Sequence, residues 1–183
     1  MLDAAGVSYS AIPAHIDENA ITAALSVEGH GARSIADALA EAKAVKIARS
    51  HAGHVVIGSD STLSVGGRLF DKPASRDQAA EHLRLFSGQE MVLTSAIVAA
   101  EDGVPVWRHV AQARLSVRPL SEAFLETYLD HEWPAISGCV GCFRIEGIGT
   151  QLFDRMTGDY FTILGMPLLP LLAWLRTRGL MPS

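Results

Sequence analysis

Residues 54–73 read HVVIGSDSTLSVGGRLFDKP, and this stretch does most to decide the fold. The apolar run Val55-Val56-Ile57 predicts a buried strand. Gly58-Ser59 then allows the chain to turn, so we expect the strand to end there and to present Asp60 beyond its carboxyl end. Ligands of open α/β sheets bind beyond the carboxyl ends of the strands, so Asp60 is a candidate functional residue.

The same stretch places a cation near this carboxylate. Lys72 follows Asp60 by a dozen residues and is held against the rigid ring of Pro73. A carboxylate can hold a divalent cation or activate water, and an ammonium group can neutralise phosphate oxygens. The pattern therefore indicates a site for a metal-bound phosphate. A solvated aspartate in an ordinary turn would leave the same pattern, so this stretch alone leaves both interpretations open.

The composition indicates an ordered protein. The chain has 183 residues, of which 49% are hydrophobic and 19% charged, enough for one sizeable core or two joined lobes. The net charge of -5 provides no general basic field for a nucleic acid polymer, whereas a small anionic ligand needs only local cations. The longest apolar stretch, residues 164–175, is interrupted by glycine and proline, and no signal peptide is evident. We therefore expect no membrane segment and a cytoplasmic location.

The two cysteines, Cys139 and Cys142, form a C-x-x-C motif. Such a motif is typical of a redox pair or of half a zinc site. A redox motif normally opens a helix, which Gly138 and Gly141 disfavour, and a zinc site needs two further ligands that no second C-x-x-C supplies. We interpret the spacing as chance, with both thiols reduced.

The hydrophobic pattern predicts a mixture of helices and strands. Helices are expected over 34–49, with Ser34 as its cap and Ile35, Leu39, Ala42 and Val45 as its apolar face, over 75–86, over 121–129, and from Pro167 onward. Strands are expected over 7–12, 90–100, 104–117, 151–156 and 160–164, with a hairpin turn at Asp102-Gly103. These elements predict an α/β fold with a mixed twisted sheet and flanking helices.

Several separate motifs, taken in order, resemble one known family. They are Ile16-Asp17-Glu18, Ala40-Glu41-Ala42-Lys43-Ala44, Gly58-Ser59-Asp60, Lys72-Pro73, Gly158-Asp159-Tyr160 and Gly165-Met166-Pro167-Leu168. Their order and spacing resemble the Maf family of nucleoside triphosphate pyrophosphatases over nearly the whole chain. The resemblance implies a single Maf-like domain over residues 1–183, with two lobes around a nucleotide cleft.

The resemblance also implies an activity. Enzymes of this family hydrolyse a nucleoside triphosphate between the α and β phosphates, release a nucleoside monophosphate and pyrophosphate, and need a divalent cation such as Mg²⁺ or Mn²⁺. Asp60 resembles the catalytic carboxylate that accepts a proton from the attacking water, and Glu18 resembles an acid that joins Asp60 at the metal. Lys43 and Lys72 resemble the basic residues that meet the triphosphate. A homodimer is also expected.

A rival hypothesis retains nucleotide binding but not hydrolysis. The historical septum-formation label of the family suggests a non-catalytic nucleotide-binding protein that acts in cell-division control. That hypothesis predicts nucleotide affinity without turnover, whereas the enzyme hypothesis predicts metal-dependent turnover.

Base selection is predicted to involve two further residues. The family branch that acts on dTTP and UTP typically reads Tyr-Gly-Ile-Gln-Gly where this chain reads Phe143-Arg144-Ile145-Glu146-Gly147. Glu146 in place of Gln resembles the 7-methyl-GTP branch, and an acceptor-only carboxylate suits the N–H donors of guanine. Ser61, which follows the catalytic aspartate, matches neither branch and is placed with the substrate-binding residues. Alternatively, Glu146 is a structural carboxylate paired with Arg144 or another cation.

The start of the chain departs from the family pattern. Family members usually begin with a strand and a loop rich in Ser and Arg, whereas this chain begins Met1-Leu2-Asp3, which resembles the end of the helix that follows. Such a loop would supply backbone N–H groups and arginines to the phosphates. We therefore predict an N-terminally shortened form that binds triphosphate poorly.

Overall fold

The computed structural model describes residues 1–182. In chain order the elements are the 3-10 helix η1 (Asp3–Ala5), α1 (Glu18–Val27), α2 (Ala32–Ala48), β1 (Val56–Val65), β2 (Arg68–Phe70), α3 (Arg76–Phe86), β3 (Glu90–Glu101), β4 (Val104–Val117), α4 (Glu122–Glu132), the 3-10 helix η2 (Ile148–Leu152), β5 (Phe153–Thr157), α5 (Tyr160–Ile163) and α6 (Leu168–Thr177). Within residues 1–182, no helix has both the length and the apolar character needed to cross a membrane.

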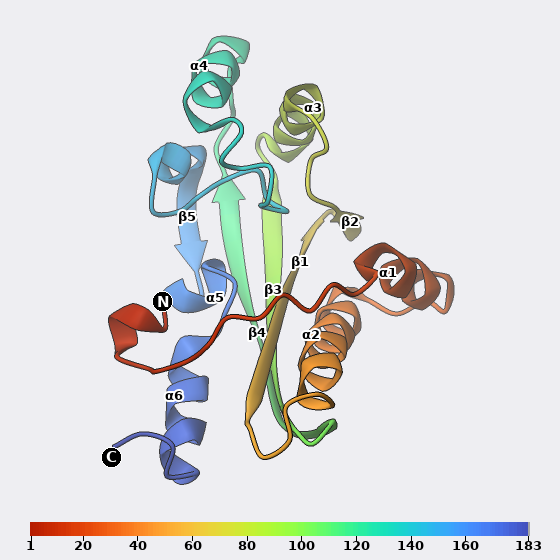
Figure 1. Ribbon diagram of the computed structural model, residues 1–183. Helices are drawn as coiled ribbons and strands as arrows, with labels where there is room; N and C mark the ends of the chain where they lie inside the picture. The colour runs from red at the N-terminus through yellow and green to blue at the C-terminus, as the bar shows by residue number, and fades with distance from the viewer. Residues whose placement is uncertain (183) are drawn as a thin grey trace. The chain divides into compact units, whose positions relative to one another are not determined.

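The strands form one five-stranded sheet in the order β2-β1-β3-β4-β5 (Figure 1). β2 pairs antiparallel with β1, and β5 pairs antiparallel with β4. β3 and β4 are joined by the expected tight turn, in which Asp102 and Gly103 both have positive φ. Strands and flanking helices together confirm the expected α/β class.

The chain forms two compact units, each assembled from separate segments. The first contains Met1–Ser61, Thr94–Ala111 and Asp159–Ser183, and the second contains Thr62–Leu93 and Gln112–Gly158. β1, β3 and β4 therefore contribute residues to both units.

In the first unit, α2 packs on the sheet through small side chains. Its buried residues Ala36, Ala40, Ala44 and Ala48 recur every fourth position and form a core cluster with Ala96, Val98 and Ala100 of β3. The predicted helix is confirmed, and Ile35 and Leu39 are buried as expected. One detail was wrong: Gly31 rather than Ser34 is the N-cap. Ala42 and Val45 are partly buried, and Val45 packs against the core cluster. The alanine stripe lets the helix backbone come closer to the sheet than larger side chains would.

α6 covers the opposite side of the same strands. Ile97 of β3 packs with Leu168, Leu171, Leu172 and Leu175, and Ile57 of β1 packs against this cluster. Alternate residues of a strand point to opposite faces, so the odd positions of β1 face α6 and the even positions face α2. Pro167 is the N-cap of α6, one residue before the helix begins, close to the predicted start.

Gly58 has a different role from the predicted one. β1 does not end at Gly58-Ser59 but continues to Val65, and the turn comes at Gly66-Gly67, where both residues have positive φ. A Cβ on Gly58 would lie 2.2 Å from the carbonyl oxygen of Ala40 and 2.7 Å from the amide nitrogen of Ala44. Gly58 is therefore a contact point between strand and helix, and Asp60 lies inside a strand.

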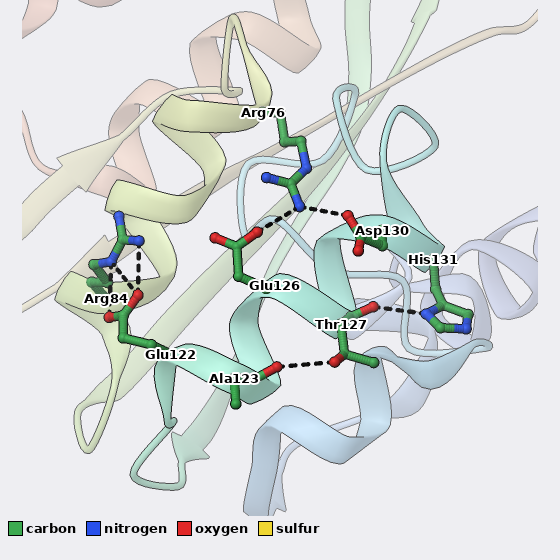
Figure 2. Close-up of polar contacts among 8 residues, drawn as sticks. All are labelled: Arg76, Arg84, Glu122, Ala123, Glu126, Thr127, Asp130 and His131. Atoms are coloured by element: carbon green, nitrogen blue, oxygen red, sulfur yellow. Dashed lines mark hydrogen bonds and ion pairs between the residues drawn. The ribbon is translucent and has the colours of Figure 1, made fainter.

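In the second unit, α3 and α4 begin at the predicted serine caps. The Ser75 hydroxyl accepts a hydrogen bond from Gln78 N–H, and the Ser121 hydroxyl accepts one from Phe124 N–H. Figure 2 shows the exposed ion pairs between the two helices: Arg76 contacts Glu126 and Asp130, and Arg84 contacts Glu122. Such exposed pairs contribute little to stability, so removing one charge from such a pair is a suitable control for substitutions elsewhere in this unit.

Two predicted strands were wrong. Residues 7–12 form no strand, because alternating residues become a strand only where another strand pairs with them. The Val7 N–H instead donates to the nearby Leu2 carbonyl. Residues 160–164 instead form α5. The Asp159 carboxylate accepts hydrogen bonds from both the N–H and the hydroxyl of Thr162, which starts a helical turn.

The first prediction concerns Gly58. We expect Gly58→Ala to lower the free energy of unfolding by about 3 kcal/mol, because the new methyl group overlaps the backbone of α2. Urea denaturation followed by circular dichroism measures the change. Gly138→Ala is the matched control, since a Cβ there meets nothing within 4 Å and its φ is not positive. Equal stability of the two variants would contradict the role given to Gly58.

Candidate functional site

Three of the residues predicted from the sequence meet at one point in the first unit. The Lys43 ammonium nitrogen lies 2.6 Å from Glu18 Oε1 and 2.5 Å from Asp60 Oδ1. The three side chains come from three different elements: Glu18 begins α1, Lys43 lies in α2, and Asp60 lies in β1. One cation is therefore shared by two carboxylates that are far apart in the sequence.

Local structure explains how each side chain reaches this point. Asp17 caps α1 through a hydrogen bond from Ala20 N–H, which fixes Glu18 in the first turn, where the helix dipole favours a negative charge. Asp60 is an even position of β1 and so faces α2, as Gly58 does. The close approach of α2 at Gly58 brings Lys43, which directly precedes Ala44, to the Asp60 carboxylate.

The three groups differ in their access to water. The Asp60 side chain is 10% exposed, that of Lys43 is 22% exposed, and that of Glu18 is 36% exposed. Burial alone would lower the pKa of Lys43, but the hydrogen bonds to Asp60 and Glu18 outweigh it and raise the pKa above its usual value. The lysine is therefore charged at neutral pH and stabilises the ionised form of both carboxylates.

Ser61 lies on the other face of β1 from Asp60. Its hydroxyl contacts the Ser95 hydroxyl at 2.7 Å and the Gly165 carbonyl oxygen at 3.3 Å. The Ser59 hydroxyl contacts the same carbonyl at 2.9 Å and the Ala96 carbonyl at 2.8 Å. These contacts hold β1 on the side opposite Lys43, so Ser59 and Ser61 fix the strand that carries Asp60. Substrate binding by Ser61 stays a prediction.

The other two predicted residues belong to the second unit. Lys72 is exposed and directly precedes the buried Pro73, and Glu146 is exposed on the segment between α4 and η2. Burial raises the pKa of the Cys139 thiol, and among the nearby charges Glu146 raises it further while Lys72 lowers it. Lys72 and Glu146 thus both lie within electrostatic range of Cys139.

Arg144, the predicted alternative partner of Glu146, is paired with a different carboxylate. The Arg144 guanidinium is paired with Glu132, through Nε to Oε2 at 2.8 Å and Nη2 to Oε1 at 3.2 Å. Glu132 is only 3% exposed and ends α4. Glu132 is not among the residues predicted from the sequence, because nothing local to a helix end marks a residue whose partner lies twelve positions later.

The profile of the Maf-like protein family matches residues 1–178. The chain belongs to the Maf family. It is 52% identical over its whole length to a nucleoside triphosphate pyrophosphatase of Sphingopyxis alaskensis and covers 93% of that protein. It is 47% identical to nucleoside triphosphate pyrophosphatase 1 of a Jannaschia species, with 98% of this chain and 91% of the relative covered. It is 46% identical to a 7-methyl-GTP pyrophosphatase of Rhizobium meliloti, with 98% and 90% covered.

The two cysteines of this Maf protein are free thiols. Cys142 is buried, and burial raises the pKa of its thiol to about 12. A thiol–disulfide enzyme needs a thiolate at neutral pH, so a raised pKa argues against the redox alternative. Within residues 1–182, no three His, Cys, Asp or Glu side chains are grouped to hold a metal ion.

The carboxylate pair of this Maf protein does suit one class of metal. Ions such as Mg²⁺ take oxygen ligands and are commonly held by one or two carboxylates, with substrate phosphates and water completing the shell. Glu18 and Asp60 offer two carboxylates that already meet one cation, the Lys43 ammonium. The donor set therefore fits Mg²⁺ or Mn²⁺ better than zinc, which prefers nitrogen and sulfur ligands.

The second prediction concerns the shared cation. In Lys43→Met the two carboxylates lose the ammonium that joins them, and ionising both becomes more costly. Protonation of the Glu18 and Asp60 carboxylates at lower pH relieves their mutual repulsion. The variant should therefore lose more free energy of unfolding, relative to wild type, at pH 7 than at pH 4.5, by about 1 kcal/mol. Urea denaturation at both pH values measures it. Lys46→Met is the control, because the hydrogen bond that Lys46 makes within residues 1–182 goes to the His15 carbonyl and not to a carboxylate. An equal loss at both pH values would contradict the electrostatic role of Lys43.

Proposed function

We propose that this protein is a nucleoside triphosphate pyrophosphatase that hydrolyses the bond between the α and β phosphates and releases a nucleoside monophosphate and pyrophosphate. The observation that carries the proposal is the lysine shared by Glu18 and Asp60 in a chain of the Maf family. Relatives that are 46–52% identical over nearly the whole chain, and that are named for this reaction, support it.

Asp60 has the environment of a general base. Its carboxylate is mostly buried and contacts the Lys43 ammonium, an opposite charge that favours the ionised form. An ionised carboxylate can orient a water molecule and take its proton as the water attacks phosphorus. Negative charge then develops on the phosphate oxygens, and a fixed ammonium group stabilises it. We assign the base role to Asp60, and phosphate binding to Lys43 and Lys72.

Glu18 and Asp60 would hold the divalent cation. A bound Mg²⁺ or Mn²⁺ ion supplies charge neutralisation for the triphosphate. Glu18 is more exposed than Asp60 and lies at the start of its helix, so its carboxylate can turn toward a cation without disturbing the core. We therefore propose that activity depends on a divalent metal and is lost on chelation.

Glu146 carries the proposal for base selection. It is exposed, and it makes no hydrogen bond or ion pair within residues 1–182. Its carboxylate can accept hydrogen bonds from the N–H groups of a guanine-type base but has nothing to donate to a pyrimidine carbonyl. We propose a preference for a guanine-type nucleotide such as 7-methyl-GTP, the substrate for which the Rhizobium meliloti relative is named.

The third prediction tests the chemistry. Asp60→Asn should lower turnover by about 10³-fold, because an amide cannot accept the proton of the attacking water. Pyrophosphate release from dTTP, UTP, CTP, GTP and 7-methyl-GTP, each with Mg²⁺ or Mn²⁺, measures the effect. The circular dichroism spectrum should stay unchanged.

Asp154→Asn is the matched control for this experiment, since Asp154 is exposed on β5 in the second unit. It should keep full activity. Nucleotide binding without turnover by the wild-type protein would contradict the enzyme proposal and favour a non-catalytic nucleotide-binding protein.

The fourth prediction tests the base. Glu146→Gln should lower the preference for 7-methyl-GTP over UTP by about tenfold, because hydrogen bonds to a charged acceptor are stronger than those to an amide. The ratio of kcat/KM for the two nucleotides measures it. Glu81→Gln, an exposed position of α3, should leave the ratio unchanged. An unchanged ratio in Glu146→Gln would remove Glu146 from base selection.

A further inference from the structure

The segment that carries Glu146 is anchored to α4 by two side chains. Tyr128 and Glu132 lie four residues apart and so share one face of the helix. The Tyr128 hydroxyl donates to the Cys142 carbonyl oxygen at 2.9 Å, and Glu132 accepts two hydrogen bonds from Arg144. Both anchors are almost fully buried, at 1% and 3% exposure.

The backbone beyond Glu146 packs against the same carboxylate. A Cβ on Gly147 would lie 3.1 Å from Glu132 Oε1, and the Gly147 N–H donates to the Arg144 carbonyl. Glu132 therefore pairs with the residue two positions before Glu146, and its carboxylate lies close to where a side chain on the residue directly after Glu146 would begin. Glu132 is thus one of two buried side chains, with Tyr128, that hold this segment against α4.

Arg144 has two carboxylates to choose between. It is hydrogen-bonded to Glu132, and Glu146 lies near enough to act on it electrostatically, since both carboxylates raise its pKa. Glu132 is buried and would be costly to leave unpaired, whereas the exposed Glu146 can be hydrated by water. Arg144 therefore stays paired with Glu132.

We propose that Glu132 is a positioning residue for base selection: by pairing its buried carboxylate with the partly exposed Arg144 guanidinium, it prevents that arginine from pairing with Glu146 and leaves the Glu146 carboxylate available to a nucleobase. This rests on the proposed function, in which Glu146 meets the base. If Glu132 loses its charge, Arg144 turns to Glu146 and neutralises it. The enzyme then loses its preference between nucleobases but keeps its turnover.

The test compares two variants. Glu132→Gln leaves Arg144 without its carboxylate, so the preference for 7-methyl-GTP over UTP should fall by about tenfold, as in Glu146→Gln, through KM more than kcat. Glu132→Gln/Arg144→Gln removes the competing cation as well, so the preference should return to the wild-type value. A merely structural role for Glu132 would instead lower turnover of both nucleotides, and the double variant would not restore it.

Arg84→Gln is the matched control, because it removes an arginine from an exposed pair with Glu122 in the same unit. It should leave the preference unchanged. If Glu132→Gln does not fold, the double variant, in which both partners of the pair are neutral, still tests the proposal: a wild-type preference supports it, and a lost preference overturns it.

The proposed function and this inference fail in different ways. A wild-type protein that releases no pyrophosphate contradicts the function, and calorimetric binding of 7-methyl-GMP and UMP then replaces turnover as the measure of preference. A wild-type protein without preference, or a Glu132→Gln variant with the wild-type preference, overturns the role of Glu132.

Discussion

The contact between Gly58 and the backbone of α2 is the constraint on which the candidate site depends. The missing side chain lets the helix come so close that a Cβ would lie 2.2 Å from the Ala40 carbonyl oxygen. At that separation, Lys43 reaches the Asp60 carboxylate with a direct hydrogen bond. A larger residue at position 58 would lift the helix from the strand and lengthen this contact. The ion pair between Lys43 and Asp60 therefore depends on the close packing at Gly58.

Local patterns predicted the elements well, because their causes lie within a few residues. Ser75 and Ser121 cap the helices that follow them, and Asp102-Gly103 makes the expected turn, since each signal acts over about four residues. Gly58 shows where such reasoning fails. A glycine before a polar run is typical of a turn, but here the reason for it lies in a helix that precedes it in the chain.

The candidate site was predicted as a set of residues but not as an arrangement. Family resemblance singled out Glu18, Lys43 and Asp60, and the structure brings these three together. No sequence pattern says that one ammonium joins both carboxylates, because that contact depends on how three elements pack. Glu132 was missed for the same reason. Its importance comes from burial and from an arginine twelve residues away, neither of which is visible in the residues around it.

Each unit contains a cation that two carboxylates act on, and the burial of those carboxylates decides which of them the cation pairs with. Lys43 contacts both of its carboxylates, and the less exposed one, Asp60, is the proposed base. In the second unit, Arg144 pairs with Glu132, because a buried carboxylate is costly to leave unpaired. Glu146 is exposed, so water or a ligand can take the place of the arginine as its partner. A buried carboxylate thereby leaves an exposed one available to the ligand, without itself contacting the ligand. Selectivity in such an arrangement depends on the helix that holds the arginine as much as on the residue that meets the base.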